Sequence, residues 1–207
     1  MRLFGLYSHP HDTDPANGRH EPSFRMSTAQ LGVLILFVSI GALFVASLAA
    51  FWITRLQSSV WLTRDMVPLP RGLWVSTAVL AATSWAFQDA LNSIRKNRFE
   101  RLQRGLRTGG ALAIVFLLLQ VLNWREMMAM HPEVANQSLY AFTFYLLTGL
   151  HWLHVVGGFA PLGVVLYRVN QREYSSSRME GIKFCVQYWH YLGAIWLVLL
   201  TTLYVAI

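Results

Sequence analysis

The chain has 207 residues, of which 55% are hydrophobic and only 13% are charged. A typical soluble domain carries about 25% charged residues, so this composition argues against a water-soluble globule. The single cysteine, Cys185, excludes an internal disulfide and any zinc or iron–sulfur site built from several cysteines.

The chain begins with a polar segment, residues 1–28, which contains three prolines and three histidines. It lacks the apolar run of a secretory signal peptide. Histidine-rich tails can bind metal ions, but His9, His11 and His20 are more simply interpreted as part of a solvated tail. We therefore expect a cytoplasmic N-terminal tail in front of an uncleaved first membrane span.

Five long apolar segments follow the tail. An α-helix needs about 20 mostly apolar residues to cross roughly 30 Å of hydrocarbon, whereas a membrane β-strand needs only about 9 to 11. The predicted spans are residues 31–53, 73–91, 109–124, 139–166 and 184–205. The predicted fold class is therefore all-α, a polytopic membrane bundle of five transmembrane helices that forms one domain, residues 29–207.

Lysine and arginine are distributed unequally between the segments that connect these spans. With the N-terminus inside, thirteen of the 17 basic residues lie in inside segments and four in outside segments. Cytoplasmic segments carry an excess of positive charge, which predicts a cytoplasmic N-terminus and an outside C-terminus. The net charge of +7 then belongs to the membrane flanks, and no nucleic-acid partner is expected. Residues 95–107 would lie along the inner leaflet or form a solvated loop.

Few ionisable side chains fall inside the predicted spans, where charge is costly and each such residue is a functional candidate. His151, His154 and His190 are the central ones. Imidazole is a common metal and haem ligand. His151 and His154 share one helix face, however, and cannot bind opposite sides of a haem, so His190 could pair with only one of them. The favoured interpretation is a hydrogen bond to another helix or to a lipid headgroup.

The remaining polar groups in the spans suit helix packing. Hydroxyl and amide side chains bond across interhelical contacts, and we interpret Ser76, Thr77 and Gln120 in this way. The chain contains no Gly-x-Ser-x-Gly, Walker or HExxH motif, and no internal repeat of the kind found in many transporters. The residues alone therefore describe a five-helix membrane protein without a visible active site, with a stand-alone haem-binding cytochrome as the alternative.

Two segments carry a recognisable pattern. Residues 148–158 read TGLHWLHVVGG and residues 188–196 read YWHYLGAIW. They resemble the TGFHGLHVIIG and YWHFVDVVW signatures of subunit III of cytochrome c oxidase, in the haem–copper oxidase family. Residues 31–44, LGVLILFVSIGALF, are similar to the family's LGMWLFLASEVMLF. Trp85 with Ala86, and Leu117 to Gln120 followed by Glu126, fit two further family elements in the correct order.

The resemblance implies the short five-helix bacterial form of this family, in the bacterial inner membrane. Such a chain is an accessory subunit that packs against catalytic subunit I, binds phospholipid and supports stability and proton uptake. It has no active site of its own and binds no metal or cofactor, because haem and copper are held by the partner subunits. The residues that the resemblance marks as lipid-binding or packing candidates are His151, Trp152, His154, Trp189, His190 and Trp196.

Three positions lack carboxylates that the family carries. Ile40 follows the serine of the first motif, Gly193 replaces the aspartate of YWHFVD, and Lys183 lies seven residues before the last-span histidine. A subunit III-like component of a nitric oxide reductase-type complex is therefore a further alternative. The electron donor of the complex, cytochrome c or quinol, leaves no mark in this chain.

Overall fold

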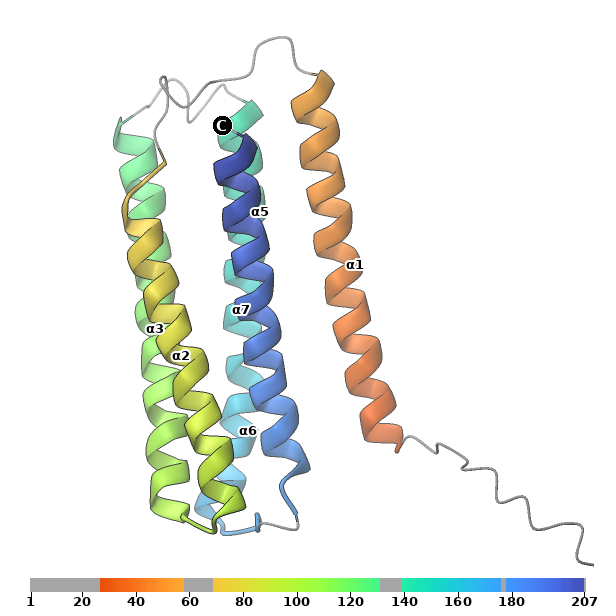
Figure 1. The fold of residues 1–207 in the computed structure, drawn as a ribbon, viewed down its shortest axis with the longest axis vertical. Coiled ribbons are helices and arrows are strands. Elements are labelled where there is room, and N and C mark those ends of the chain that lie inside the picture. Colours follow the sequence, from red (N-terminus) through yellow and green to blue (C-terminus); the bar gives the residue numbers. More distant parts are fainter. Residues whose placement is uncertain (1–26, 58–68, 131–138, 176–177, 207) are drawn as a thin grey trace, which may run out of the picture.

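The computed structural model describes residues 27–57, 69–130, 139–175 and 178–206. Within these ranges the regular secondary structure is helical. The helices are α1 (Thr28–Gln57), α2 (Gly72–Arg95), α3 (Phe99–Met130), α5 (Leu139–Gly157), α6 (Phe159–Asn170) and α7 (Glu180–Ala206) (Figure 1). Nearly all of the predicted tail lies outside the described residues.

The described helices make five antiparallel passes, with α5 and α6 together forming the fourth (Figure 1). The all-α prediction with five long helical passes is confirmed. The first, third, fourth and fifth passes are each long and apolar enough to cross a membrane by length and composition. α2 has sufficient length, at 24 residues, but it is less apolar than the other four.

α1 begins with a reciprocal pair of capping hydrogen bonds. The backbone N–H of Gln30 donates to Ser27 Oγ at 3.2 Å, and the backbone N–H of Ser27 donates to Gln30 Oε1 at 3.0 Å. Such a capping box satisfies backbone donors that have no partner inside the helix. The helix therefore covers Thr28–Gln57 and extends beyond the predicted span 31–53 at both ends.

α3 begins well before the predicted span 109–124. The turn from α2 into α3 contains Asn97 at φ 54°, a conformation that asparagine tolerates. The prediction of a solvated loop for residues 95–107 is wrong from Phe99 onward, because these residues begin α3, whereas their place beside the inner leaflet stays a prediction. Leu102 and Leu106, one helical turn apart, are fully buried, so an amphipathic repeat continues the packed face of α3 through this basic segment.

The fourth pass is interrupted once, at Gly158, between α5 and α6. Pro161 lies three residues later and has no backbone N–H to donate to the carbonyl of Gly157. The loss of this bond accounts for an interruption at this point, as proline does in other long helices. The predicted span 139–166 thus corresponds to two helices that make one pass, Leu139–Asn170.

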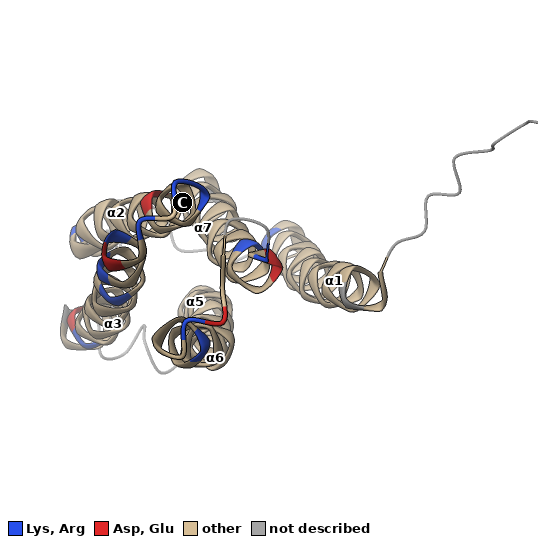
Figure 2. Ribbon diagram, turned by 90° about the horizontal axis from the view of Figure 1, so that it is seen from below, with Lys and Arg blue, Asp and Glu red and all other residues tan. Residues whose placement is uncertain are grey.

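α7 occupies the centre of the bundle and contacts α1, α2, α5 and α6. Viewed along the passes, α1 lies at one edge beside α7, and α2 and α3 lie on the other side (Figure 2). α1 meets the bundle along a narrow strip that includes Ile40, Phe44 and Phe51, whereas many of its other apolar side chains are exposed. An exposed apolar surface of this kind suits a helix surrounded by lipid.

α2 and α3 form the most extensive helix pair and approach each other closely at Gly105. A Cβ at position 105 would lie 2.9 Å from Ala90 Cβ and 3.2 Å from the carbonyl oxygen of Ala86. Small residues on facing helices allow such approach in membranes. The close contact therefore depends on the missing side chain.

We expect Gly105→Ala to lower the free energy of unfolding by about 1–3 kcal/mol, because the added methyl group must displace α2. Thermal unfolding in detergent, followed with a thiol-reactive fluorescent dye, measures the change. Cys185 is the only cysteine and is 2% exposed, so it becomes reactive when the core opens.

Gly149→Ala is the matched control, because no heavy atom lies within 4 Å of a Cβ at position 149. Its Tm should stay the same or rise, since alanine is favoured over glycine inside a helix by about 0.5–1 kcal/mol. An equal loss of Tm in both variants would contradict the close α2–α3 contact.

Candidate functional site

His151 lies at the centre of the bundle, inside a set of aromatic rings. Its side chain is completely buried. The ring centroids of Phe44 in α1, Phe116 in α3 and Trp196 in α7 lie 6.3, 5.8 and 5.2 Å from that of His151. Three other passes therefore enclose the imidazole, which leaves it without contact to solvent or lipid.

Trp196 extends this cluster to the remaining pass. Its Nε1–H donates to Thr77 Oγ1 in α2 at 3.0 Å, and its ring contacts Phe116 with a centroid distance of 5.2 Å. Thr77 can accept this bond because its own hydroxyl donates to the carbonyl of Leu73 at 2.8 Å. The pair of His151 and Trp196, which we call the central pair, thus contacts all five passes.

Three polar side chains of the core, His151, Gln120 and Trp189, lack hydrogen-bond partners among the described residues. Neither ring nitrogen of His151 and neither side-chain polar atom of Gln120 forms a hydrogen bond with the described residues. The prediction that Gln120 bonds across an interhelical contact is therefore wrong for the described part of the chain. Gln120 is fully buried on α3, one turn after Phe116. Leaving such groups without partners costs about 1–3 kcal/mol each.

His154 is held by its own helix. Its Nδ1 lies 2.8 Å from the carbonyl oxygen of Leu150, one turn earlier in α5. Its backbone carbonyl accepts a hydrogen bond from Tyr188 Oη at 2.8 Å, and its ring lies 5.2 Å from that of Phe44. His154 therefore connects α5 to α1 and α7, away from the enclosed position of His151.

His190 faces α2 and is half-buried. Its Nε2 lies 3.1 Å from Gln88 Oε1, and Gln88 Nε2 donates to Asn92 Oδ1 at 3.3 Å. Because an amide oxygen only accepts, Nε2 of His190 carries the proton in this arrangement. The result is a short polar chain along the contact between α2 and α7.

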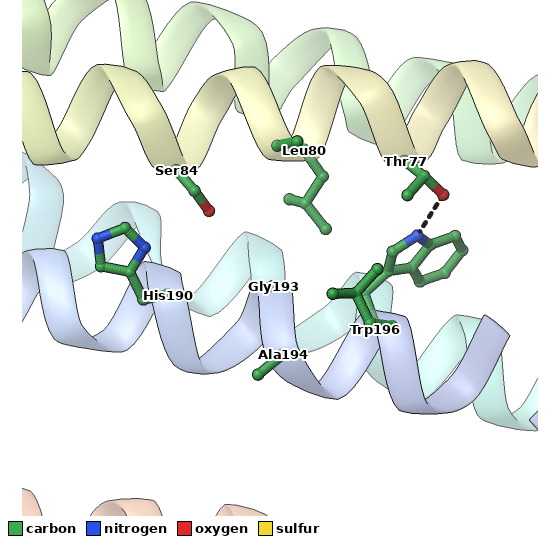
Figure 3. A pocket seen from close by; sticks show the side chains of 9 residues that line it. Thr77, Leu80, Ser84, His190, Gly193, Ala194 and Trp196 are labelled. Carbon is green, nitrogen blue, oxygen red and sulfur yellow. Dashed lines mark hydrogen bonds between the residues drawn. The ribbon is translucent and has the colours of Figure 1, made fainter. Parts of the chain in front are cut away.

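A pocket of about 380 Å³ lies beside His190, between α2 and α7 (Figure 3). Leu80 and Ser84 project toward it from α2, and Gly193 lies opposite on α7. A Cβ at position 193 would lie 3.3 Å from Ser84 Oγ, so the glycine gives the pocket part of its depth. Its walls are mainly apolar, with the polar groups of His190 and Ser84 at one end.

The two other predicted tryptophans pack in different places. Trp152 Nε1 donates to the carbonyl of Leu117 at 3.3 Å, which joins α5 to α3. Trp189 is 1% exposed and stacks on Phe87 with a centroid distance of 5.0 Å. Of the six predicted residues, His151 and Trp196 are brought into ring contact from distant parts of the chain.

The three histidines do not fit a haem. His151 is enclosed by rings on three sides, His154 uses one nitrogen on its own helix, and His190 uses one on α2. Axial ligands must face each other across an open space that accepts the macrocycle. In the described residues no group of three His, Cys, Asp or Glu side chains could hold a metal ion either. Each of the three histidine side chains contacts a side chain of another pass.

One ion pair was missed by the sequence reasoning. Arg101 Nε and Nη2 donate to the two oxygens of Asp89 at 3.0 and 2.9 Å, a bidentate bond from α3 to α2. Asp89 lies near the end of the predicted span 73–91. The signal was present, because the short turn around Asn97 makes residues on either side of it neighbours in antiparallel helices.

The positions that lack family carboxylates have ordinary structural surroundings. Ile40 is 7% exposed and lies on the strip through which α1 meets the bundle. Gly193 lines the pocket described above, and Lys183 Nζ lies 2.7 Å from Glu180 Oε1. An apolar side chain therefore occupies the buried position 40, where a carboxylate would need a partner.

The fold and the packed histidines define a polytopic helical membrane protein whose motif residues hold the passes together. The family model for cytochrome c oxidase subunit III matches residues 12–206. A protein named cytochrome c oxidase subunit 3 from Synechocystis sp. is 30% identical over 193 residues, which cover 91% of this chain and 79% of that protein.

A protein of the same name from Drosophila melanogaster is 28% identical over 180 residues, covering 84% of this chain and 67% of the relative. One from Aepyceros melampus is 26% identical over 194 residues, covering 90% and 72%. The chain belongs to the cytochrome c oxidase subunit III family. The resemblance seen in the motifs is confirmed.

We expect the two simplest substitutions of His151 to differ. His151→Ala removes a ring from a fully enclosed site and should lower the free energy of unfolding by about 2–5 kcal/mol. His151→Phe keeps a ring and removes two polar atoms without partners, so its stability should stay within about 1 kcal/mol of the unsubstituted protein. Dye-monitored thermal unfolding compares them. A loss as large for phenylalanine as for alanine would show that the ring nitrogens bind a polar group in the core.

Proposed function

We propose that this chain is the accessory, non-catalytic subunit III of a respiratory haem–copper terminal oxidase, the complex that reduces oxygen. The observation that carries the proposal is the central pair. His151 belongs to TGLHWLHVVGG and Trp196 to YWHYLGAIW, and these two family motifs meet at the point that contacts all five passes. Motif residues that pack a bundle, rather than form a site, support an accessory role.

The chemistry of such a complex then lies in its other subunits. Haem and copper are bound there, and catalytic subunit I is the partner against which this chain packs. Its contribution is to stabilise that partner and to support proton uptake. The central pair supports this stabilising role, because it holds the five passes together and so keeps the outer surface of the bundle in place for a partner subunit.

We propose the bacterial inner membrane as the location, with the N-terminal side cytoplasmic. The turn between α2 and α3 and the segment between α6 and α7 lie at the same end of the bundle, together with most of the described lysines and arginines (Figure 2). Basic residues favour the cytoplasmic side. The opposite end carries Arg55, Arg71 and Arg125.

The same basic end supports binding of anionic phospholipid. Each lysine or arginine near an anionic membrane surface contributes about 1 kcal/mol. Arg104 and Thr108 of α3 line a groove of about 420 Å³ with the ion pair of Asp89 and Arg101. Exposed Trp85 lines the same groove, so an acyl chain and a headgroup would both find suitable surfaces.

Purification of a tagged chain in mild detergent from its native membrane tests the proposed function. We expect haem–copper oxidase chains to co-purify and the complex to show haem absorption. The chain expressed alone should show no stoichiometric Soret band, because its histidines are used in packing. Absence of any oxidase chain from the purified material, or a Soret band in the isolated chain, would refute the accessory role.

Cysteine labelling in intact cells tests the orientation. We expect Arg71→Cys, at the start of α2, to react with an impermeant maleimide, and Lys96→Cys, after its end, to react only after permeabilisation. Both positions are exposed, and the native Cys185 is buried and unreactive. The reverse pattern of labelling would place the basic end outside the cell.

A further inference from the structure

The outer face of α2 is unusual for a helix in a membrane. The other four described passes are apolar enough to cross a membrane by composition, and α2 is not. Its exposed positions include Ala78, Ala81 and Ala82 as well as the larger Trp74, Val75 and Trp85, so part of its outer face carries only small side chains. A pass in contact with lipid is expected to present an apolar surface. Small side chains on a membrane helix allow another helix to approach closely, so this part of the free side of α2 is suited to a protein neighbour.

The pocket between α2 and α7 opens on that side. Ala81, Ala194 and Leu197 line it and are all exposed, so it is accessible from the surface of the bundle. In Figure 3, Ser84 and Leu80 project from α2 toward α7, and the small residues Gly193 and Ala194 leave the hollow between the helices. We call this surface the α2–α7 face.

Polar groups on this face lie at the depth of the hydrocarbon. His190 is ten residues after Glu180, about 15 Å along α7, whereas the hydrocarbon begins only a few ångströms from the end of a helix of this length. His190 Nδ1 and Ser84 Oγ form no hydrogen bond with the described residues. Polar side chains in the hydrocarbon normally face protein, because lipid tails cannot bond to them.

We propose that the α2–α7 face binds a transmembrane helix of another subunit of the oxidase complex, an inference that rests on the proposed function. The partner helix places an apolar side chain in the hollow beside Gly193 and Ala194. At the level of Ser84 and His190 it supplies a hydrogen-bonding group. An acyl chain would fill the hollow equally well, but it cannot bond to Ser84 Oγ or His190 Nδ1.

Two matched substitutions test this face. Ala194→Trp fills the pocket from an exposed position of α7, and Ala42→Trp places the same side chain on exposed α1. Each alanine lies fourteen residues after the first residue of its helix, and both helices begin at the same end of the bundle, so the two positions are at a similar depth. In the native membrane, we expect the other oxidase subunits to co-purify at least tenfold less with Ala194→Trp than with Ala42→Trp.

A second measurement does not depend on added bulk. A diazirine analogue of leucine has nearly the size of leucine and can replace Leu197, which lines the pocket, or Leu43 on α1. Illumination of the complex should crosslink position 197 to another oxidase subunit. Position 43 should crosslink mainly to lipid. Unchanged thermal unfolding of each isolated variant confirms that its bundle is intact.

The outcomes separate this inference from the proposed function. If the unsubstituted chain brings down no oxidase subunit, the proposed function fails. If it does, but Ala194→Trp assembles as well as Ala42→Trp, the α2–α7 face is not the interface. Crosslinking of position 197 to lipid alone would show that an acyl chain occupies the pocket. Crosslinking to another molecule of this protein would show that a second copy occupies it. Either result overturns the inference.

Discussion

The structure depends on one constraint of the hydrocarbon, that a polar group within it can form hydrogen bonds only with partners inside the protein. Trp196 meets it by donating to Thr77, whose hydroxyl donates in turn to a carbonyl of its own helix. Trp124 and Thr148 repeat this arrangement between α3 and α5. Trp124 Nε1–H donates to Thr148 Oγ1 at 3.0 Å, and the Thr148 hydroxyl donates to the carbonyl of Phe144 at 2.7 Å. Each hydroxyl satisfies its proton locally, which leaves its oxygen free to accept a bond from the neighbouring helix.

The same arrangement occurs a third time, with an amide as the donor. Asn123 Nδ2 donates to Ser76 Oγ, and that hydroxyl donates to the carbonyl of Gly72, both at 3.0 Å. Apolar contacts alone would not fix the helices, because lipid tails are as apolar as leucine side chains. Directional bonds of this kind set the rotation of each helix, and the ring contacts around His151 then fill the space between them.

The sequence predicts the passes well because hydropathy needs only local information. Hydropathy locates the ends of a helix poorly where the helix extends beyond its apolar segment. The basic start of α3 was not predicted, although Leu102 and Leu106 continue its apolar repeat. The cap formed by Ser27 and Gln30 was readable from its spacing and was missed. The enclosure of His151 could not be predicted from the sequence. It is made by residues of helices that are distant in the sequence, and their contacts depend on how the bundle packs.

The residues of a family motif are commonly examined first as ligands of a metal ion or cofactor, and two histidines close together in a membrane helix suggest such a site. Here the two motifs are constrained by contacts between passes, since His151 and Trp196 together contact every one of them. A substitution at either position therefore affects the whole bundle rather than one site. α2 differs from the other four passes, because it packs closely on α3 and α7 and is less apolar than they are. The contacts among the described helices thus hold the bundle together, and the partner helix that we propose for the α2–α7 face would cover its outer surface at α2.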